Sequence, residues 1–434
     1  MPAVALPPPA EAPITRPVRR RRRLPPWLRS WGDTLVLLVF AGAFAPFLPG
    51  SGMDTDDARA VDVVSRLIFS TAYVIAGLGI LKRPRLALRV AKRSTWLWVL
   101  LAWAVLSVLW SDTPALSGRR VIGLVGTTLV GFHLALRYDA DRLLRLLTRV
   151  VTIGVAMTAL LALAVPEIGV MSGIHEGAWS GPFLHKNPMG RFMALALVVY
   201  YLASLDASRG RKWLLRLGMA AAAGLLLLST SKTAILVAIV LMCVVAPTAR
   251  VVASRANVRL LIPAGLLAGL VAAGAGIALA ENWGALMSAL GRDASLTGRT
   301  LLWAVATDMA MQRPWLGYGY GGFWLGGSGP SGAFWTAVGW DAQHTHNALL
   351  DLWLDLGLIG AVWFLAGVVR LFWRALADLR GRAEGAARWP LFYLAFVILY
   401  SITESGIVKQ HSLFWVLFAA VVCAQQRDEH QSVP

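Results

Sequence analysis

The sequence has 434 residues, of which 57% are apolar and 15% are charged, with a formal net charge of +18. Soluble globular domains average about 25% charged residues, so the composition excludes an ordinary soluble domain and favours a membrane protein with several spans. The excess of Lys and Arg falls in alternate loops, which the positive-inside rule explains better than nucleic-acid binding does. Cys243 and Cys423 lie inside apolar segments and are expected to pack as small hydrophobic residues, without a disulfide or a metal.

The N-terminal segment, residues 1–30, is predicted to be a disordered, basic cytoplasmic tail. It is rich in Pro and Ala and contains a run of arginines at residues 19–23. Basic runs of this kind bind anionic lipid headgroups. A short apolar stretch followed by a small-residue cleavage site is not evident, so a cleaved signal peptide is not expected. A twin-arginine export signal is the alternative.

Apolar segments of about 20 residues, within a range of about 17–25, are long enough to cross a bilayer. About twelve segments of this kind are predicted, near residues 34–49, 63–81, 95–110, 120–136, 149–165, 189–205, 213–229, 233–247, 258–280, 347–373, 388–403 and 409–426. Residues 31–280 would hold the first nine transmembrane helices and residues 347–427 the last three. Residues 281–346 would form a large periplasmic loop, and residues 428–434 a short cytoplasmic tail.

The basic residues orient these spans. Placing the N-terminus in the cytoplasm puts the Lys- and Arg-rich loops at 82–93, 137–149, 209–216, 250–259 and 374–388 on the cytoplasmic side. Basic residues on the opposite side need a separate explanation. They include Arg66, Arg119, Arg120, Lys186, Arg191, Lys232, Arg299 and Lys409. Glu404, in the last outer loop, is expected to pair with Lys409.

A cationic corner is predicted where a loop rich in Pro and Gly enters the helix near residue 189. His185, Lys186 and Asn187 stand at the start of this helix, and Arg191 follows about one turn later. A helix N-terminus favours anions, and an arginine can bind two phosphate oxygens at once. The corner is therefore interpreted as a phosphate-binding site. The alternative is that its cations reach toward the headgroups of the outer leaflet.

Two further cations are candidates for binding an anion on the outer side. Lys232 follows a tight Ser229-Thr230-Ser231 turn between apolar segments, and an interfacial lysine is the alternative reading. Arg299 stands in the first turn of a helix expected to begin at Thr297 and to end before Pro314. This helix is expected to be amphipathic and to lie on the membrane surface. Arg299 opposes the helix dipole, so it is expected to serve a bound anion unless it is a plain surface arginine.

His344 and His346 lie where the long outer loop meets a strongly apolar helix. An imidazole exchanges protons near neutral pH, which suits a general base. Asn347, Asp351 and Asp355 follow at i, i+4 and i+8 and share one helix face. A His-x-His zinc site is one alternative, although no third ligand is evident nearby. Polar contacts between helices, without a catalytic role, are the other.

Taken in order, these motifs resemble the O-antigen ligase and polymerase superfamily. The resemblance covers roughly residues 173–361 and includes two loose motifs, His344-x-His346-Asn347-x-x-Leu350 and Asp355-x-Gly357-x-x-Gly360. Gly298-Arg299 with Trp303, and Pro314 with Gly317 and Gly319, precede them. His185-Lys186-Asn187 followed by Gly190 is similar to the exopolysaccharide-polymerase branch.

The resemblance implies an all-α, polytopic integral membrane protein with a large periplasmic loop, like lipid-dependent glycosyltransferases. It implies that a glycan is transferred from undecaprenyl pyrophosphate to an acceptor glycan or lipid-linked repeat at the periplasmic face of the bacterial inner membrane. The products would be O-antigen or exopolysaccharide, formed by polymerisation or by ligation. No metal, other cofactor or nucleic acid is expected.

The resemblance also suggests roles for single residues. The functional histidine of the family corresponds to His346, with His344 as the second choice, and its essential arginines correspond to Arg191 and Arg299. Lys232 stands where many members have arginine, and lysine keeps the charge but loses the bidentate fork. Asp355 stands where glutamate is common.

The residue chemistry and the resemblance point to one mechanism. The cations Arg191 and Arg299, together with Lys186 and Lys232, are expected to bind the diphosphate and take up charge as it leaves. His346 would orient or deprotonate the acceptor hydroxyl. The expected substrate-binding set is completed by His185, Asn187, Asn347 and Asp355. The main alternative is a transporter or flippase of lipid-linked sugars, whose charges would line a cavity open to both faces.

Overall fold

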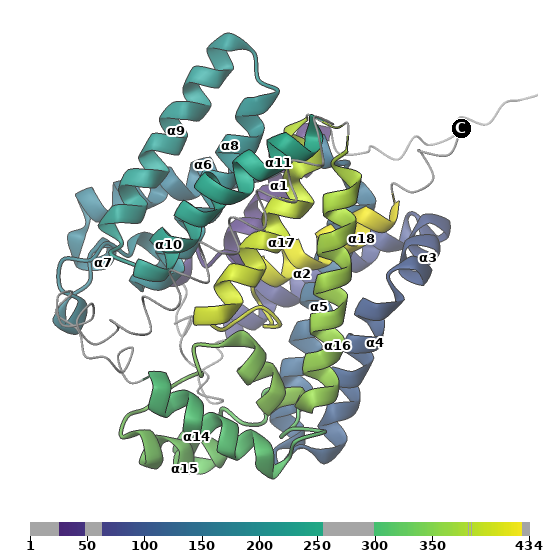
Figure 1. Ribbon diagram of the computed structural model, residues 1–434, viewed down its shortest axis with the longest axis vertical. Helices are drawn as coiled ribbons and strands as arrows, with labels where there is room; N and C mark the ends of the chain where they lie inside the picture. Colours follow the sequence, from purple (N-terminus) through teal and green to yellow (C-terminus); the bar gives the residue numbers. More distant parts are fainter. Residues whose placement is uncertain (1–25, 48–62, 255–298, 381, 383, 428–434) are drawn as a thin grey trace, which may run out of the picture.

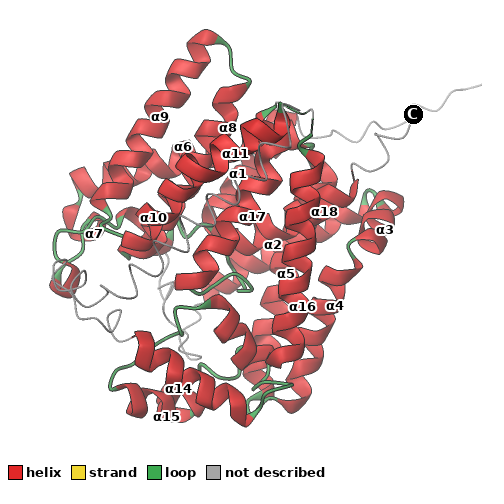
Figure 2. Cartoon of the chain, in the orientation of Figure 1, coloured by secondary structure: helices red, strands yellow, loops and turns green. Residues whose placement is uncertain are grey.

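The computed structural model describes residues 26–47, 63–254, 299–380, 382 and 384–427. Within these ranges the regular elements are helices, and no strand is present (Figure 2). Seven of the described helices are long and apolar enough to cross a membrane, or eight if the bent pair Pro84–Arg93 and Thr95–Trp110 forms one span. The prediction of an all-α polytopic membrane protein is confirmed. The described residues account for seven or eight of the roughly twelve predicted spans, and the span expected near 258–280 lies outside them.

Two groups of helices are joined by a central one (Figure 1). The first group contains α2 (Val63–Leu81), α5 (Pro114–Arg137) and α18 (Leu413–Arg427). The second contains α6 (Ala140–Ala164), α8 (Lys186–Leu205) and α9 (Arg209–Leu228). Helix α17 (Gly385–Thr403) contacts α8, α18 and α16 (Ala348–Asp378), and so links the groups.

The remaining elements complete the chain between these helices. They are α1 (Pro26–Phe40), η1 (Ala45–Phe47), α3 (Pro84–Arg93), α4 (Thr95–Leu106), η2 (Ser107–Trp110), α7 (Pro166–Gly169), η3 (Gly173–His175), η4 (Gly181–Phe183), α10 (Lys232–Val240), η5 (Leu241–Val245), α11 (Ala246–Ala253), α14 (Arg299–Gln312), η6 (Gly326–Ser328) and α15 (Pro330–Val338).

Burial differs between helices in a way that the hydrophobic pattern explains. Helix α8 is apolar on all sides and is mostly buried, with Met189, Phe192 and Met193 fully enclosed. Helix α2 instead exposes Leu67, Val74 and Leu78. Apolar side chains exposed along a long apolar helix are typical of a surface that faces lipid.

The segment predicted as the first basic cytoplasmic loop is in fact largely helical. Helix α3 begins at Pro84, which suits a first helical position because its missing N–H would have no partner there. Ala87 and Val90 are buried, while Arg85 and Arg89 are exposed. The helix meets the following apolar helix at 84°. The few apolar residues of α3 recur at helical spacing, and this spacing makes the segment a packed helix despite its high charge.

Helix α16 is not the single straight span that the sequence predicts for 347–373. Gly357 has φ 70° and ψ 179°, which divides α16 into a short first arm and a long second arm. The backbone N–H of Tyr318 donates to the Leu354 carbonyl at 2.7 Å, and the N–H of Leu358 donates to the Pro314 carbonyl at 2.8 Å. The turn after α14 thus inserts into the hydrogen-bond ladder of α16, which is a recognised cause of a kink.

Replacing Gly357 with alanine is expected to destabilise the protein strongly. The backbone conformation at this position is essentially restricted to glycine and costs other residues about 1–3 kcal/mol. A Cβ would also lie 2.0 Å from the Trp315 carbonyl oxygen. Thermal unfolding in detergent measures the effect. Gly224→Ala is the matched control, because its Cβ meets nothing within 4 Å; equal unfolding temperatures for the two variants would contradict the steric argument.

Helices α14 and α15 lie at the end of the molecule opposite the tip of α9 (Figure 1). Leu302, Ala306 and Ala310 of α14 are buried in a separate small core. The predicted end of this helix before Pro314 is confirmed, and its expected cap at Thr297 lies outside the described residues. Leu301 and Met311 are exposed, so apolar residues also occupy the outer side and α14 is less clearly amphipathic than predicted.

Candidate active site

The turn that contains the two histidines is held rigidly. The backbone N–H of His346 donates to His344 Nδ1 at 3.3 Å, and the two ring centroids are 4.1 Å apart. His346 has φ 54°, in the left-handed region. Asp351 Oδ1 accepts from the Thr345 N–H at 2.9 Å, and Trp303 Nε1 donates to the Thr345 carbonyl at 2.9 Å. Contacts with α14 and α16 therefore hold the backbone of this turn, and the hydrogen bond to Nδ1 orients the His344 ring.

The two histidines differ in what they can do chemically. Because His344 Nδ1 accepts a hydrogen bond, the neutral ring carries its proton on Nε2 and can act there only as a donor. Burial, followed by the charges of His346, Lys409, Arg191 and Arg299, holds the pKa of His344 well below its usual range. His344 is consequently neutral at neutral pH and a weak base. The geometry favours His346 as the proton acceptor.

Glu404 contacts residues from three separate segments of the site. One carboxylate oxygen, Oε2, lies 3.5 Å from His346 Nδ1. The other, Oε1, lies 3.5 Å from Arg299 Nη2 and accepts from Asn187 Nδ2 at 3.4 Å. Burial raises the pKa of Glu404, but the hydrogen bond from His346 and the positive charges of Arg299 and Arg191 outweigh it, so the net pKa lies below its ordinary value. Glu404 is therefore an ionised carboxylate at neutral pH.

The predicted cationic corner at the start of α8 belongs to the same cluster. Ser231 Oγ donates to Asn187 Oδ1 at 3.2 Å, and His185 Nδ1 caps the helix by accepting from the Asn187 N–H at 3.2 Å. A Cβ at Gly190 would lie 2.7 Å from Ser231 Cβ. The absence of a side chain at Gly190 thus lets α8 approach the turn before α10. Polar contacts run from Ser231 through Asn187 to Glu404.

Arg191 contributes a second guanidinium beside Arg299. Its Nη1 donates to the Ser405 carbonyl at 3.2 Å, and its Cζ lies 4.2 Å from the centre of the Phe414 ring. Its Nε has no hydrogen-bond partner among the described residues. A guanidinium has five N–H donors, so Arg191 keeps donors for an anion in the neighbouring cavity.

A cavity of about 810 Å³ connects these groups. Its polar lining includes His185, Asn187, Arg191, Ser231, His344, His346, Asp351, Asp355, Glu404 and Lys409. Arginine and histidine from distant parts of the chain thus converge on one space. This arrangement can hold a polyanion next to an imidazole that a carboxylate orients.

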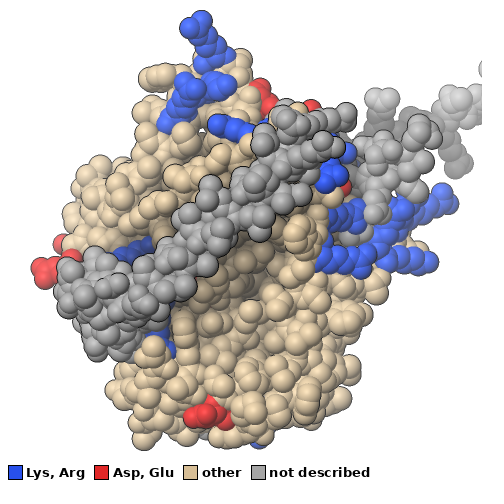
Figure 3. All heavy atoms as spheres, viewed as in Figure 1, with Lys and Arg blue, Asp and Glu red and all other residues tan. Residues whose placement is uncertain are grey.

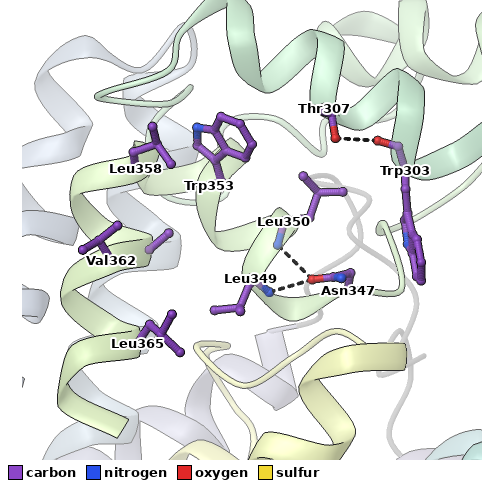
Figure 4. A pocket seen from close by; sticks show the side chains of 10 residues that line it. Trp303, Thr307, Asn347, Leu349, Leu350, Trp353, Leu358, Val362 and Leu365 are labelled. Carbon is purple, nitrogen blue, oxygen red and sulfur yellow. Dashed lines mark hydrogen bonds between the residues drawn. The ribbon is translucent and has the colours of Figure 1, made fainter. Parts of the chain in front are cut away.

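A second, apolar groove of about 380 Å³ begins beside the histidine turn. Figure 4 shows the two arms of α16 facing each other across it, with Leu349 and Leu350 on the first arm and Val362 and Leu365 on the second. Trp303 of α14 closes the end nearest Thr345, to which it is hydrogen-bonded. Val362 and Leu365 are 60% and 46% exposed, so the other end of the groove is open.

Comparison with known proteins supports the resemblance that the sequence motifs suggest. Residues 217–365 match the family model described as O-antigen ligase. The resemblance to the O-antigen ligase and polymerase superfamily is confirmed. The chain is also similar to the exopolysaccharide production protein ExoQ of Rhizobium meliloti (strain 1021), with 29% identity over 315 residues that cover 68% of each chain. These findings support a function in O-antigen ligation or polymerisation, or in exopolysaccharide production.

The family match covers only part of the site. It includes Arg299, His344 and His346, whereas Arg191 and Glu404 lie outside it. Arg191, His344, His346 and Glu404 line the cavity, and Arg299, which does not line it, contacts Glu404.

The structure gives the other sequence-derived candidates different positions. His185, Asn187 and Asp355 line the cavity. Asn347 caps α16, because its Oδ1 accepts from the N–H groups of Leu349 and Leu350 at 3.1 Å each. It lines the apolar groove instead of the polar cavity.

Lys186 and Lys232 are not among the residues that line the cavity. Each is the first residue of its helix, next to a residue that does line it, Asn187 or Ser231. Successive side chains on a helix point about 100° apart. When one of them faces the cavity, its neighbour therefore points to the side. The expected role of both lysines in holding the diphosphate stays a prediction, as does that of Arg299, which is also absent from the cavity lining.

The sequence did not reveal the importance of Glu404. It suggested a pair with Lys409, whereas the ion-pair partners of Glu404 among the described residues are Arg299 and His346. One signal could have identified it. A carboxylate in a short outer loop between two apolar helices is costly to bury without a cationic partner, and the outer side offered several unexplained cations.

Proposed function

We propose that this chain transfers a glycan from undecaprenyl pyrophosphate to an acceptor glycan at the periplasmic face of the bacterial inner membrane. One observation supports this most directly. Glu404 contacts both His346 and Arg299, beside Arg191, at the edge of a single cavity. A proton acceptor and two cations suited to a diphosphate leaving group therefore lie together.

In the proposed reaction, His346 Nε2 takes the proton of the acceptor hydroxyl as its oxygen attacks the anomeric carbon of the donor glycan. The bond from that carbon to the diphosphate oxygen breaks, and the electron pair leaves with undecaprenyl diphosphate. Glu404, facing His346 Nδ1, stabilises the imidazolium that forms and fixes the ring orientation. His344 positions the backbone of His346 by accepting its N–H.

The leaving group requires positive charge that is already in place. Arg191 and Arg299 would bind the diphosphate oxygens and stabilise their growing charge, which arginine does well because its N–H donors match pairs of phosphate oxygens. The proposed chemistry requires no metal ion, because the guanidinium groups supply this charge. The side chain of Asn187 donates to Glu404 and so holds the carboxylate next to the start of α8.

The distribution of charge supports the periplasmic assignment. On the face seen in Figure 3, Lys and Arg gather around the tip of α9 and around α3, and few appear near α14 and α15. The positive-inside rule assigns the basic end to the cytoplasm. The histidine turn, which is hydrogen-bonded to α14, then belongs to the opposite side.

The apolar groove between the arms of α16 suits the polyprenyl chain of the donor. It starts at the histidine turn and opens toward the exposed apolar side of α16. A lipid in this position would place its diphosphate next to Arg299 and His346. We propose that the groove binds the first isoprene units of the donor.

Filling the groove is expected to weaken donor binding selectively. Val362→Trp should raise KM for the lipid-linked donor roughly tenfold, equivalent to about 1.4 kcal/mol, and should affect a donor with a very short prenyl chain much less. Val369→Trp is the matched control, since Val369 is exposed on the same helix outside the groove. Equal KM changes in the two variants would rule out the groove as the lipid site.

Reconstitution tests the proposed function. Purified protein in liposomes, supplied with lipid-linked oligosaccharide, is expected to form new glycosidic bonds, detected as longer glycans on gels and by mass spectrometry. Movement of the lipid-linked oligosaccharide across the bilayer without new bonds would identify a transporter instead. The His346→Asn variant serves as the inactive control.

A further inference from the structure

We propose that Trp340, with Gln343 and Gln410, forms a subsite for a sugar ring of the donor glycan beyond the ring that reacts, an inference that rests on the proposed function and deepens it. The group recognised is a pyranose ring. Its C–H face packs on the flat face of an aromatic side chain, and its hydroxyl groups pair with the donors and acceptors of side-chain amides. The subsite would select the donor by its glycan as well as by its lipid diphosphate.

Trp340 presents a large apolar surface to a cavity lined with polar groups. It is 47% exposed and lines the cavity of about 810 Å³ that also contains His344 and His346. An exposed tryptophan in a membrane protein can also serve as an anchor at the membrane interface. Trp315 fits that explanation, because it is 64% exposed and is not among the residues that line the cavity. The position of Trp340 in the cavity instead favours contact with a ligand.

The turn that carries Trp340 is held by its backbone. The N–H of Gly339, which has φ 81° and caps α15, donates to the Trp335 carbonyl at 2.8 Å. The N–H of Ala342 donates to the Trp340 carbonyl at 2.9 Å, and Trp335 Nε1 donates to the Ala342 carbonyl at 2.5 Å. Ala342 is fully buried. The backbone of Trp340 is thus ordered before a ligand binds, which lowers the entropic cost of binding.

Gln410 supplies a polar group from a distant segment of the chain. It lines the cavity, and its Oε1 accepts from Tyr320 Oη at 2.9 Å. This contact leaves the two N–H donors of Gln410 Nε2 for a ligand hydroxyl. Tyr320 belongs to a loop that the buried Arg120 holds by donating to the carbonyl oxygens of Gly321 and Trp324. Gln410 therefore rests on a fixed wall of the cavity.

The same wall is joined to the turn of Trp340. Tyr320 and Trp324 both line the cavity. Trp324 also belongs to the small core that contains Ala342, two residues after Trp340, and its ring centroid lies 5.3 Å from that of Phe334 in α15. These contacts tie the wall that supports Gln410 to the segment that presents Trp340. An aromatic face and a side-chain amide thus border one part of the cavity.

Gln343 adds a second amide between Trp340 and the histidines. It is half-buried and lines the cavity, directly before His344 in the sequence. An amide offers both a carbonyl acceptor and two N–H donors, which suits a hydroxyl group that donates and accepts. A sugar ring packed on Trp340 would therefore find hydrogen-bonding groups from Gln343 and Gln410 in the same cavity.

The order of the groups along this segment matches the order of parts in the donor. Asn347 and Leu350 line the apolar groove proposed for the prenyl chain, whereas His346 and Trp340 line the polar cavity. Lipid, diphosphate and glycan follow one another in the donor in the same direction. Trp340 and His346 are six residues apart, a separation that cannot exceed about 20 Å. The subsite is therefore within reach of a short oligosaccharide whose first ring lies at His346.

Binding of donors with long and short glycans tests the inference. The full-length protein in phosphatidylcholine nanodiscs carries His346→Asn, so that bound donor is not consumed. This parent protein is titrated with radiolabelled undecaprenyl diphosphate that carries either an oligosaccharide or only the reacting monosaccharide. Adding Trp340→Leu is expected to raise Kd for the lipid-linked oligosaccharide roughly five- to tenfold. Kd for the lipid-linked monosaccharide should stay the same, which also shows that the variant is folded.

Three further variants, made in the same parent protein, identify the contacts. Trp340→Phe keeps an aromatic face and should recover most of the affinity for the lipid-linked oligosaccharide. Gln343→Met keeps the length of the side chain without its hydrogen-bonding groups, and should weaken binding of the oligosaccharide form alone. Trp315→Leu is the matched control, since it removes an exposed tryptophan outside the cavity. It should bind both ligands as the parent protein does.

Four results would overturn the inference. They are equal affinity of the parent protein for the two ligands, an unchanged Kd for the lipid-linked oligosaccharide in Trp340→Leu, an equal rise of Kd for the lipid-linked monosaccharide, and an equal effect of Trp315→Leu, which would indicate membrane anchoring. Because the assay measures binding without transfer, these results are separate from a failure of the proposed function. That failure would appear in the reconstitution, as natural protein that forms no glycosidic bond.

Discussion

The Glu404→Gln variant is expected to lose glycan transfer by roughly 100-fold or more, the scale on which general acid–base catalysis contributes. The substitution keeps the size of the side chain but removes the negative charge that faces Arg299 and His346. His346 would lose the group that orients its ring and stabilises its protonated form. The measurement is the initial rate of glycan extension by reconstituted protein.

The pH profile separates a charge effect from a general loss of structure. The net pKa of Glu404 lies below its ordinary value of 4.5, so its carboxylate persists through the ordinary carboxyl range. Above that range the negative charge of Glu404 contributes fully to activity and stability. The contribution is lost as the pH falls through the pKa that Glu404 has in the folded protein, which is lower than its ordinary value. The stability of the natural protein, measured as its unfolding temperature in detergent, should therefore show an acid limb below pH 4.5 that Glu404→Gln lacks.

Glu176→Gln is the matched control for Glu404→Gln. Glu176 is an exposed carboxylate in the predicted outer segment between α7 and α8, and it does not line the cavity. Its loss should leave the rate unchanged. A Glu404→Gln protein with the full natural rate and an unchanged acid limb would remove Glu404 from the mechanism.

The His346→Asn variant is expected to reduce transfer roughly 10²- to 10⁴-fold, because it removes the proposed proton acceptor. Asparagine is chosen because it tolerates the positive φ of 54° at this position better than alanine does. The fold should therefore be retained, which thermal unfolding in detergent checks. Initial transfer rates at saturating donor give the effect.

The His344→Asn variant provides the comparison that assigns the two histidines. An asparagine side chain can accept a hydrogen bond from the N–H two residues ahead, as His344 Nδ1 does now. The turn should persist and the rate should fall much less than in His346→Asn. The opposite order of the two rates would make His344 the proton acceptor.

The site also explains why polar groups gather at the end of so apolar a bundle. A buried carboxylate without a partner would be strongly destabilising, whereas Glu404 has Arg299, His346 and Asn187 around it. Removing one member of such a network leaves the others unsatisfied. Variants that keep size and hydrogen-bonding capacity are therefore the informative ones.

Several features followed from the sequence because their causes are local. Twenty apolar residues in succession can satisfy their backbone within a membrane only as a helix, and alternate loops are rich in basic residues, which favours placing those loops on one side of the membrane. The bounds of α2 agree with the prediction for 63–81. A histidine pair at the start of an apolar helix, and arginines on the side poor in basic residues, stood out for the same local reasons.

Only the tertiary structure decided which residues meet. The contact of Glu404 with Arg299 and His346, the exclusion of Lys186 and Lys232 from the cavity lining, and the break of α16 at Gly357 all depend on how separate helices pack. Hydropathy determines that a segment is a buried helix, but the side that faces a cavity depends on its neighbours. The physical reason is that the free energy of burying a side chain depends on its apolar area and not on which atoms it meets. An ion pair or a kink, in contrast, requires particular atoms from distant segments to lie within a few ångströms of each other.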